Sequence, residues 1–168
     1  FQNSLQVTKT WHLRTPENSD LAVIDTPAGL TRQELISATR GADAILIPVM
    51  PSDIDIHAVM KCISDLLLVA KIPRPDMKIG IIANRVRANT RVYGQLKKFL
   101  SSLDIPVVAT LRDSQNYTRA FEFGMGIHEM PFSQVKKDID AWSDIMGWLD
   151  RLRERNLGQP SAIHYLRG

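Results

Sequence analysis

The sequence predicts an α/β fold in which helices cover both faces of a parallel sheet. Short apolar runs, typical of strands buried on both faces, alternate along the chain with segments whose apolar residues follow the helical period. Parallel strands need crossover connections, and the intervening helices supply them. The 168 residues, of which 44% are hydrophobic and 23% charged, fit one folded domain with a substantial core.

The predicted strands are residues 21–24, 44–49, 78–83 and 105–110. Ligands of such sheets bind beyond the carboxyl ends of the strands. Asp25, Pro51 and Asn84 each follow a predicted strand, and the loop 110–113 closes the last one. We therefore expect these positions to line one edge of the sheet.

Five helices are predicted between and after the strands, at about residues 31–40, 52–70, 91–103, 113–123 and 133–154. Thr31-x-x-Glu34 and Ser52-x-x-Asp55 have the spacing of capping boxes. Asp113 is the predicted cap of the fourth helix, which Gly124-Met125-Gly126 ends. The last helix is predicted to bury a stripe that consists of Ile139, Trp142, Met146, Leu149 and Leu152.

The most informative segment is the predicted first strand with the loop that follows it, Val23-Ile24-Asp25-Thr26-Pro27-Ala28-Gly29. A carboxylate at the end of a rigid strand can be held near a magnesium ion, and a glycine lets the backbone approach a phosphate closely. The pattern is short, and an ordinary strand that ends in an Asp-containing loop explains it equally well.

Charge and cysteine content restrict the possible partners. The segment 71–98 carries eight Lys and Arg residues against Asp76 alone, a net charge of +7, which suits either a phosphate backbone or a solvated helix face. Cys62 is the only cysteine, so an internal disulfide is excluded, and a cytoplasmic location is the default expectation. We interpret Cys62 as a small core residue, and Trp142 and Trp148 as core or interface anchors.

Four motifs in this order resemble the C-terminal two-thirds of ParA/MinD-type ATPases: VIDTPAG, ADAILIPVMPSDIDIHA, IGIIANRV and DIPVVATLRDSQNYTRAFEFGMGIHE. The likeness covers about residues 20–129 and is strongest to the ParA branch, which partitions chromosomes and plasmids. It implies a P-loop NTPase fold of the deviant Walker A class, with ATP and Mg²⁺ as cofactors.

The chain departs from the family at the phosphate loop, because no glycine-rich KGGxGKT segment occurs in it. We therefore expect a fragment or truncated product of a larger ATPase that lacks the N-terminal strand and the phosphate loop. Residues 1–156 are expected to form the C-terminal two-thirds of one domain, and 157–168 a flexible tail. ATP hydrolysis is expected of the parent protein and stays open for this chain.

The resemblance implies roles for named residues. Asp25 is similar to the Walker B carboxylate, which holds Mg²⁺ through water and orients the attacking water, while Pro27 and Gly29 resemble the switch loop that senses the γ-phosphate. Asn84 resembles the asparagine that contacts the adenine edge, although it can instead satisfy backbone groups of its loop. The other wall of the base pocket is expected at Leu111, Arg112 and Asp113.

The resemblance also implies partners. Family members dimerise around two nucleotides, bind DNA without sequence preference in the ATP state, and respond to a centromere-binding protein that stimulates the ATPase. The implied location is cytoplasmic and nucleoid-associated, with no membrane partner. Candidates for the phosphate contacts are Arg85, Arg87, Arg91, Lys97, Lys98 and Arg119.

Three other functions fit parts of the sequence. A MinD-like cell-positioning ATPase binds lipid through a basic C-terminal helix. This function is disfavoured because the segment 157–168 carries only Arg167 as a basic residue. A metal-cluster carrier of the superfamily needs paired cysteines, which the single Cys62 disfavours, although a symmetric dimer can contribute one cysteine from each chain. A non-enzymatic module that keeps the interaction surface but binds no nucleotide is favoured only by the missing phosphate loop.

Overall fold

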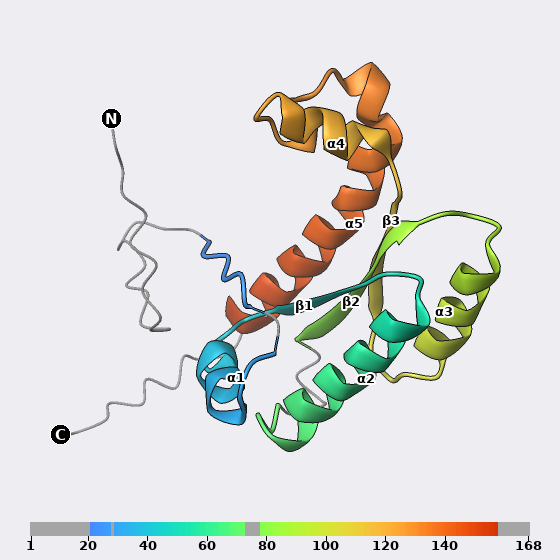
Figure 1. Ribbon diagram of the computed structural model, residues 1–168. Coiled ribbons are helices and arrows are strands. Elements are labelled where there is room, and N and C mark those ends of the chain that lie inside the picture. The colour runs from blue at the N-terminus through green and yellow to red at the C-terminus, as the bar shows by residue number, and fades with distance from the viewer. Residues whose placement is uncertain (1–20, 28, 73–77, 158–168) are drawn as a thin grey trace.

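Three parallel strands form the sheet of the computed structural model, which describes residues 21–27, 29–72 and 78–157 (Figure 1). The strands β1 (Ile45–Val49), β2 (Ile79–Val86) and β3 (Val107–Arg112) lie side by side in that order. β1 pairs with β2, and β2 with β3, both in parallel register. The predicted parallel α/β architecture is confirmed.

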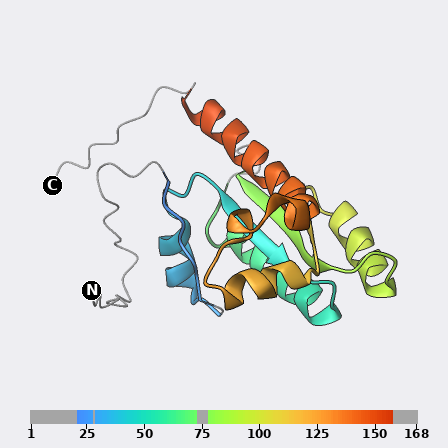
Figure 2. The same ribbon diagram turned by 90° about the horizontal axis from the view of Figure 1, so that it is seen from above.

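Helices cover both faces of the sheet, as Figures 1 and 2 show. On one face, α2 (Asp53–Leu68) and α3 (Arg91–Ser101) bury Val59, Ile63, Leu66, Leu96 and Leu100 against the strands. On the other face, α5 (Phe132–Leu157) packs against β3 and the outer side of β2. The central strand is therefore buried on both sides, which explains its continuous apolar sequence.

The close approach of α5 to the sheet depends on a glycine. Gly80 lies in β2, and a Cβ atom there would stand 2.4 Å from Val108 Cγ2 and 3.0 Å from Trp148 Cζ2. Trp148 is buried, as predicted for a core anchor. Of the stripe predicted for α5, Leu152 is buried, and Ile139, Trp142 and Leu149 pack partly buried against the core. The prediction is wrong for Met146, which is about half exposed, while its neighbour Ile145 is buried.

Side-chain caps begin the first three helices, and the sequence predicts two of these three caps. The Thr31 hydroxyl and the Glu34 carboxylate form a full capping box before α1 (Arg32–Thr39). Ser52 accepts a hydrogen bond from the Asp55 N–H at the start of α2. Thr90, which is not among the predicted caps, caps α3 by accepting a hydrogen bond from the Tyr93 N–H.

The two threonine caps are expected to differ in their effect on global stability. Thr31→Ala should fray α1 with little change in the free energy of unfolding, because α1 has no buried residue. Thr90→Ala should cost about 1 kcal/mol, because α3 buries Leu96 and Leu100. Urea unfolding measures both variants, and equal losses would contradict the assignment of α1 to the periphery.

The structure corrects the first predicted strand. Residues 21–24 form no strand, and Leu21, Val23 and Ile24 are 69%, 85% and 45% exposed. An apolar run becomes a strand only when a neighbour accepts its backbone hydrogen bonds, and in the described residues the sheet consists of β1, β2 and β3 alone. The sequence pattern shows the apolar run but not the partner that it needs.

Several boundaries also move. β2 continues through Val86 and β3 through Arg112, so both strands extend two or three residues beyond their predicted ends. Ser114, not Asp113, caps α4 (Gln115–Glu122), because Asp113 is engaged by the neighbouring strand. A short 3₁₀ helix, η2 (Ile127–Glu129), follows α4. The predicted break at 72–75 and the predicted tail fall largely outside the described residues.

Candidate functional site

The carboxyl ends of β2 and β3 meet at one edge of the sheet. Val86 is the register partner of Arg112, and the Asp113 N–H donates to the Val86 carbonyl oxygen at 2.9 Å. This pairing joins the IGIIANRV and LRDS segments, which are some 25 residues apart in sequence. It brings Asn84 to the same edge as Leu111, Arg112 and Asp113, as expected for two walls of one site.

Asn84 lies within β2 rather than after it. The pairing of β2 with β3 is irregular between Ala83 and Val86, and Arg85 has a φ of 50°, which is left-handed backbone. Non-glycine residues adopt such backbone rarely, and bulges of this kind re-aim side chains at sheet edges. The half-buried Asn84 accepts the Arg85 N–H through Oδ1 at 2.9 Å. That bond fits the backbone-satisfying alternative, and adenine contact stays a prediction.

Asp113 interacts with two arginines, one in β2 and one directly after it. Its carboxylate accepts from Arg87 Nε at 2.7 Å and lies 3.5 Å from Arg85 Nε. The hydrogen bond from Arg87 is the main cause that holds the pKa of Asp113 below its usual value, and both arginine charges add to it. Two cations thus share one carboxylate, which leaves a net positive charge at this edge.

Leu111 and Arg112 have different surroundings from those expected of a loop, because both belong to β3. Leu111 is buried in the core under α5. Arg112 forms a two-pronged ion pair with Asp138 of α5, with Nε–Oδ1 and Nη2–Oδ2 distances of 2.6 and 2.8 Å. Arg112 therefore supports the edge from behind, and its role as a base-pocket wall stays untested.

Asp138 is the residue at this edge that the sequence reading missed. It is fully buried and also accepts from Asn116 Nδ2 at 2.8 Å and Ser114 Oγ at 3.4 Å. Burial opposes its charged form, but the hydrogen bonds from Arg112, Asn116 and Ser114 outweigh burial and lower the pKa. A signal was present, because Asp138 falls on the buried face of α5, three residues after Val135 and seven before Ile145.

Asp25, Pro27 and Gly29 do not join this edge. They lie in the exposed segment before α1, and both views place that segment on the side where β1 begins (Figures 1 and 2). With no strand at 21–24, no strand direction carries Asp25 to the carboxyl edge. The expectation of a single edge holds for the ends of β1, β2 and β3, whereas the strand that was expected to carry Asp25 there is absent. The roles of Asp25 in Mg²⁺ binding and of Pro27 and Gly29 in phosphate sensing stay predictions.

The basic candidates fall into two places. Arg85, Arg87 and Arg91 lie at the end of β2 and the start of α3, all exposed, and the exposed Lys97 and Lys98 follow on α3. Lys97 Nζ stands 4.9 Å from the centre of the Tyr93 ring. Arg119 is exposed on α4, a separate helix (Figure 1).

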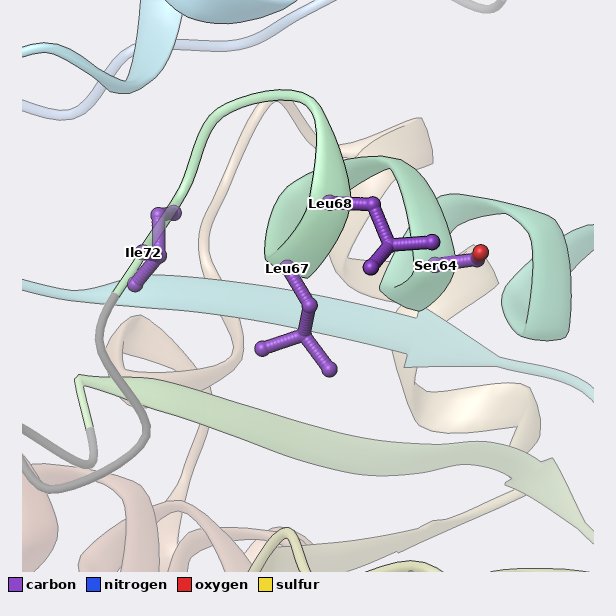
Figure 3. Close-up of a pocket in the computed structure, with 4 residues that line it drawn as sticks. All are labelled: Ser64, Leu67, Leu68 and Ile72. Atoms are coloured by element: carbon purple, nitrogen blue, oxygen red, sulfur yellow. The ribbon is translucent and has the colours of Figure 1, made fainter.

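The described residues contain no group of three or more His, Cys, Asp or Glu side chains that could hold a metal ion. Among them, no helix is both long and apolar enough to cross a bilayer. A hollow of about 340 Å³ opens at the far end of α2, where Ser64, Leu67, Leu68 and Ile72 line it (Figure 3). Its lining residues carry no ionisable group, and they belong to the end of α2 remote from the edge described above.

No family model matches the chain, but comparison with known proteins found a related sequence and a similar solved structure. The maintenance of carboxysome distribution protein A of Halothiobacillus neapolitanus (strain ATCC 23641 / c2) is 25% identical over 114 residues. This match covers 67% of the chain and 52% of the relative. The MinD cell division protein of Aquifex aeolicus superposes with a TM-score of 0.53 and 18% identity.

The structural match covers 83% of this chain and 54% of MinD, so the chain spans about half the length of either protein. This chain has a P-loop NTPase-like α/β fold, and the two comparisons together support its assignment to a ParA/MinD-type family.

Proposed function

We propose that this chain is part of a ParA-like ATPase whose β2–β3 edge binds the base of ATP. The observation that carries the proposal is the register of β2 with β3, which brings Asn84 and Asp113 to one edge. The amide of Asn84 can donate and accept hydrogen bonds, and Asp113 offers a carboxylate acceptor beside its backbone groups. Both are suited to the hydrogen-bonding edge of a base. Asp25 is proposed to hold Mg²⁺ through water, and the residues that bind the phosphates are left unassigned.

Titration of the chain with Mg²⁺ and ATP tests this proposal. Amide NMR signals of residues 84–87 and 111–114 should shift first, and Asn84→Ala should weaken binding about tenfold, as expected for one lost hydrogen bond. Gln95→Ala, which removes an exposed amide on α3, is the matched control. Shifts spread evenly over the surface, or equal losses in both variants, would overturn the proposed site.

We further propose that the parent protein dimerises in its ATP state and binds DNA without sequence preference through the exposed cations near α3. The support is the run Arg85, Arg87 and Arg91 with Lys97 and Lys98 on one stretch of chain. The proposed partner is a centromere-binding protein that stimulates the ATPase. The proposed location is the cytoplasm, in association with the nucleoid.

The DNA proposal predicts a change in salt dependence. The double variant Arg87→Ala with Arg91→Ala should weaken binding equally to two unrelated duplexes. It should also lower the slope of log affinity against log salt concentration by about 2, because each lost phosphate contact contributes about 0.9. Lys136→Ala with Lys137→Ala removes the same charge from exposed positions on α5. Fluorescence anisotropy across salt concentrations measures both, and identical slopes would rule out the α3 surface.

A second candidate is a cell-positioning ATPase that distributes a protein assembly rather than DNA. The name of the sequence relative, maintenance of carboxysome distribution protein A, favours this cargo, and the structural match to the MinD cell division protein agrees with a positioning role. Both candidates use the same nucleotide edge. Co-purification of the parent protein with either DNA or a protein assembly distinguishes them.

A further inference from the structure

The buried carboxylate of Asp138 ties three consecutive parts of the edge to α5. Its oxygens accept from Arg112 at the end of β3, from Ser114, the cap of α4, and from Asn116 in the first turn of α4. Asp138 has no exposed surface, and in the described residues no buried side-chain polar atom lacks a partner. The Asp138 end of every hydrogen bond in this cluster is therefore shielded from water, whereas the Arg112 side chain is 45% exposed.

Asp113 lies between Arg112 and Ser114 in sequence, but its own interactions are with the end of β2. Its N–H and carboxylate engage Val86, Arg85 and Arg87 of the β2 end. The residues on both sides of Asp113 are thus held from α5, while Asp113 itself is held from β2. Residues 111–116 turn from the end of β3 into the start of α4, and we call this segment the turn 111–116. It is fixed both from β2 and from α5, and its attachment to α5 depends on the Asp138 carboxylate alone.

Buried ion pairs are a poor source of stability, since apolar residues of similar size often stabilise as well or better. They do impose geometry, because a two-pronged arginine–carboxylate pair accepts only one mutual orientation. We propose that Asp138 is a positioning residue of the nucleotide site, which holds the turn 111–116 so that Asp113 and Asn84 face one ligand. This inference rests on the proposed function, because that turn is one wall of the proposed base pocket.

The test compares Asp138→Asn with Asp140→Asn in the full chain. Both variants remove one negative charge from α5, but Asp140 is exposed and Asp138 is buried. The first readout is amide hydrogen exchange without nucleotide. Asp138→Asn should speed exchange at Asp113 and its neighbours about tenfold relative to the β1 and α2 amides, as for the loss of one well-placed hydrogen bond. Asp140→Asn should leave the pattern unchanged.

The second readout is the preference for ATP over GTP in the same proteins. A loosened base wall should reduce that preference several-fold in Asp138→Asn and leave it intact in Asp140→Asn. A general loss of stability lowers the affinity for both nucleotides together and does not change their ratio. Uniform exchange across the chain in Asp138→Asn, or an unchanged ratio beside a local increase in exchange, overturns the positioning role.

Failure of the proposed function gives a different result. If the unmodified chain binds neither nucleotide, the nucleotide proposal fails. The exchange measurement then decides alone whether Asp138 positions the turn. A local effect in Asp138→Asn would support the positioning role, and a uniform or absent effect would overturn it.

Discussion

Replacing Arg112 by alanine should destabilise the protein by about 3 kcal/mol at neutral pH. The reason is the partner left behind, since Asp138 is fully buried and would keep its charge with only Asn116 and Ser114 as donors. Removing one member of a buried pair costs about 3–5 kcal/mol, and the lower end applies because the Arg112 side chain is 45% exposed. Urea unfolding measures the loss.

The pH dependence identifies the cause of that loss. In the unmodified protein the pKa of Asp138 lies below its usual value, so its stabilising effect is complete above about pH 4 and falls as the carboxylate protonates below that pH. In Arg112→Ala the buried carboxyl loses its cation, which raises its pKa. The difference in stability between the two proteins should therefore shrink as the pH is lowered.

Lys61→Ala is the control for a pair of the same charge types in a different setting. The Lys61–Asp65 pair lies on α2 with the lysine side chain 79% exposed, and such surface pairs contribute little to stability because water screens them. If Lys61→Ala and Arg112→Ala cost the same at neutral pH, the buried Asp138 cluster would not be the source of the larger effect.

Gly80→Ala should destabilise the protein by about 1–3 kcal/mol, and Gly80→Val by more. The new Cβ atom would stand 2.4 Å from Val108 Cγ2, closer than side chains tolerate, and would also press on Trp148. Val108 is β-branched and has little rotamer freedom, so β2 and β3 must shift locally. The 3.0 Å approach to Trp148 would also push α5 away from the sheet. Thermal unfolding followed by tryptophan fluorescence reports both the stability and the surroundings of Trp148.

Gly94→Ala provides the opposite expectation with the same chemical change. Gly94 lies within α3, and a Cβ atom there meets nothing within 4 Å. Alanine favours the helix and restricts the unfolded chain, so stability should rise by about 0.5–1 kcal/mol. If Gly80→Ala caused no loss of stability, the close packing of α5 on β2 would be contradicted. If Gly94→Ala caused a loss, the open space beside Gly94 would be contradicted.

Local pattern was enough to predict most of the fold. The apolar runs of β1, β2 and β3, the caps at Thr31 and Ser52, and the glycines after α4 each depend on neighbours in sequence. The order of those elements predicted the parallel sheet and the placement of Asn84 and Asp113 at one edge of it. The predicted ends of β2 and β3 come too early, because the charged Arg85 and Arg112 continue these strands where the strands reach the surface.

What the sequence by itself determined is the α/β class, the starts of α1 and α2 and the likeness to ParA/MinD-type ATPases, since all three follow from periodicity, capping and motif order. Only the tertiary structure decided that residues 21–24 have no strand partner, that Asp113 binds Arg85 and Arg87, and that Asp138 anchors the turn beside it. These features depend on which distant residues meet. A hydrogen bond or an ion pair has two partners, and one chain position records only one of them.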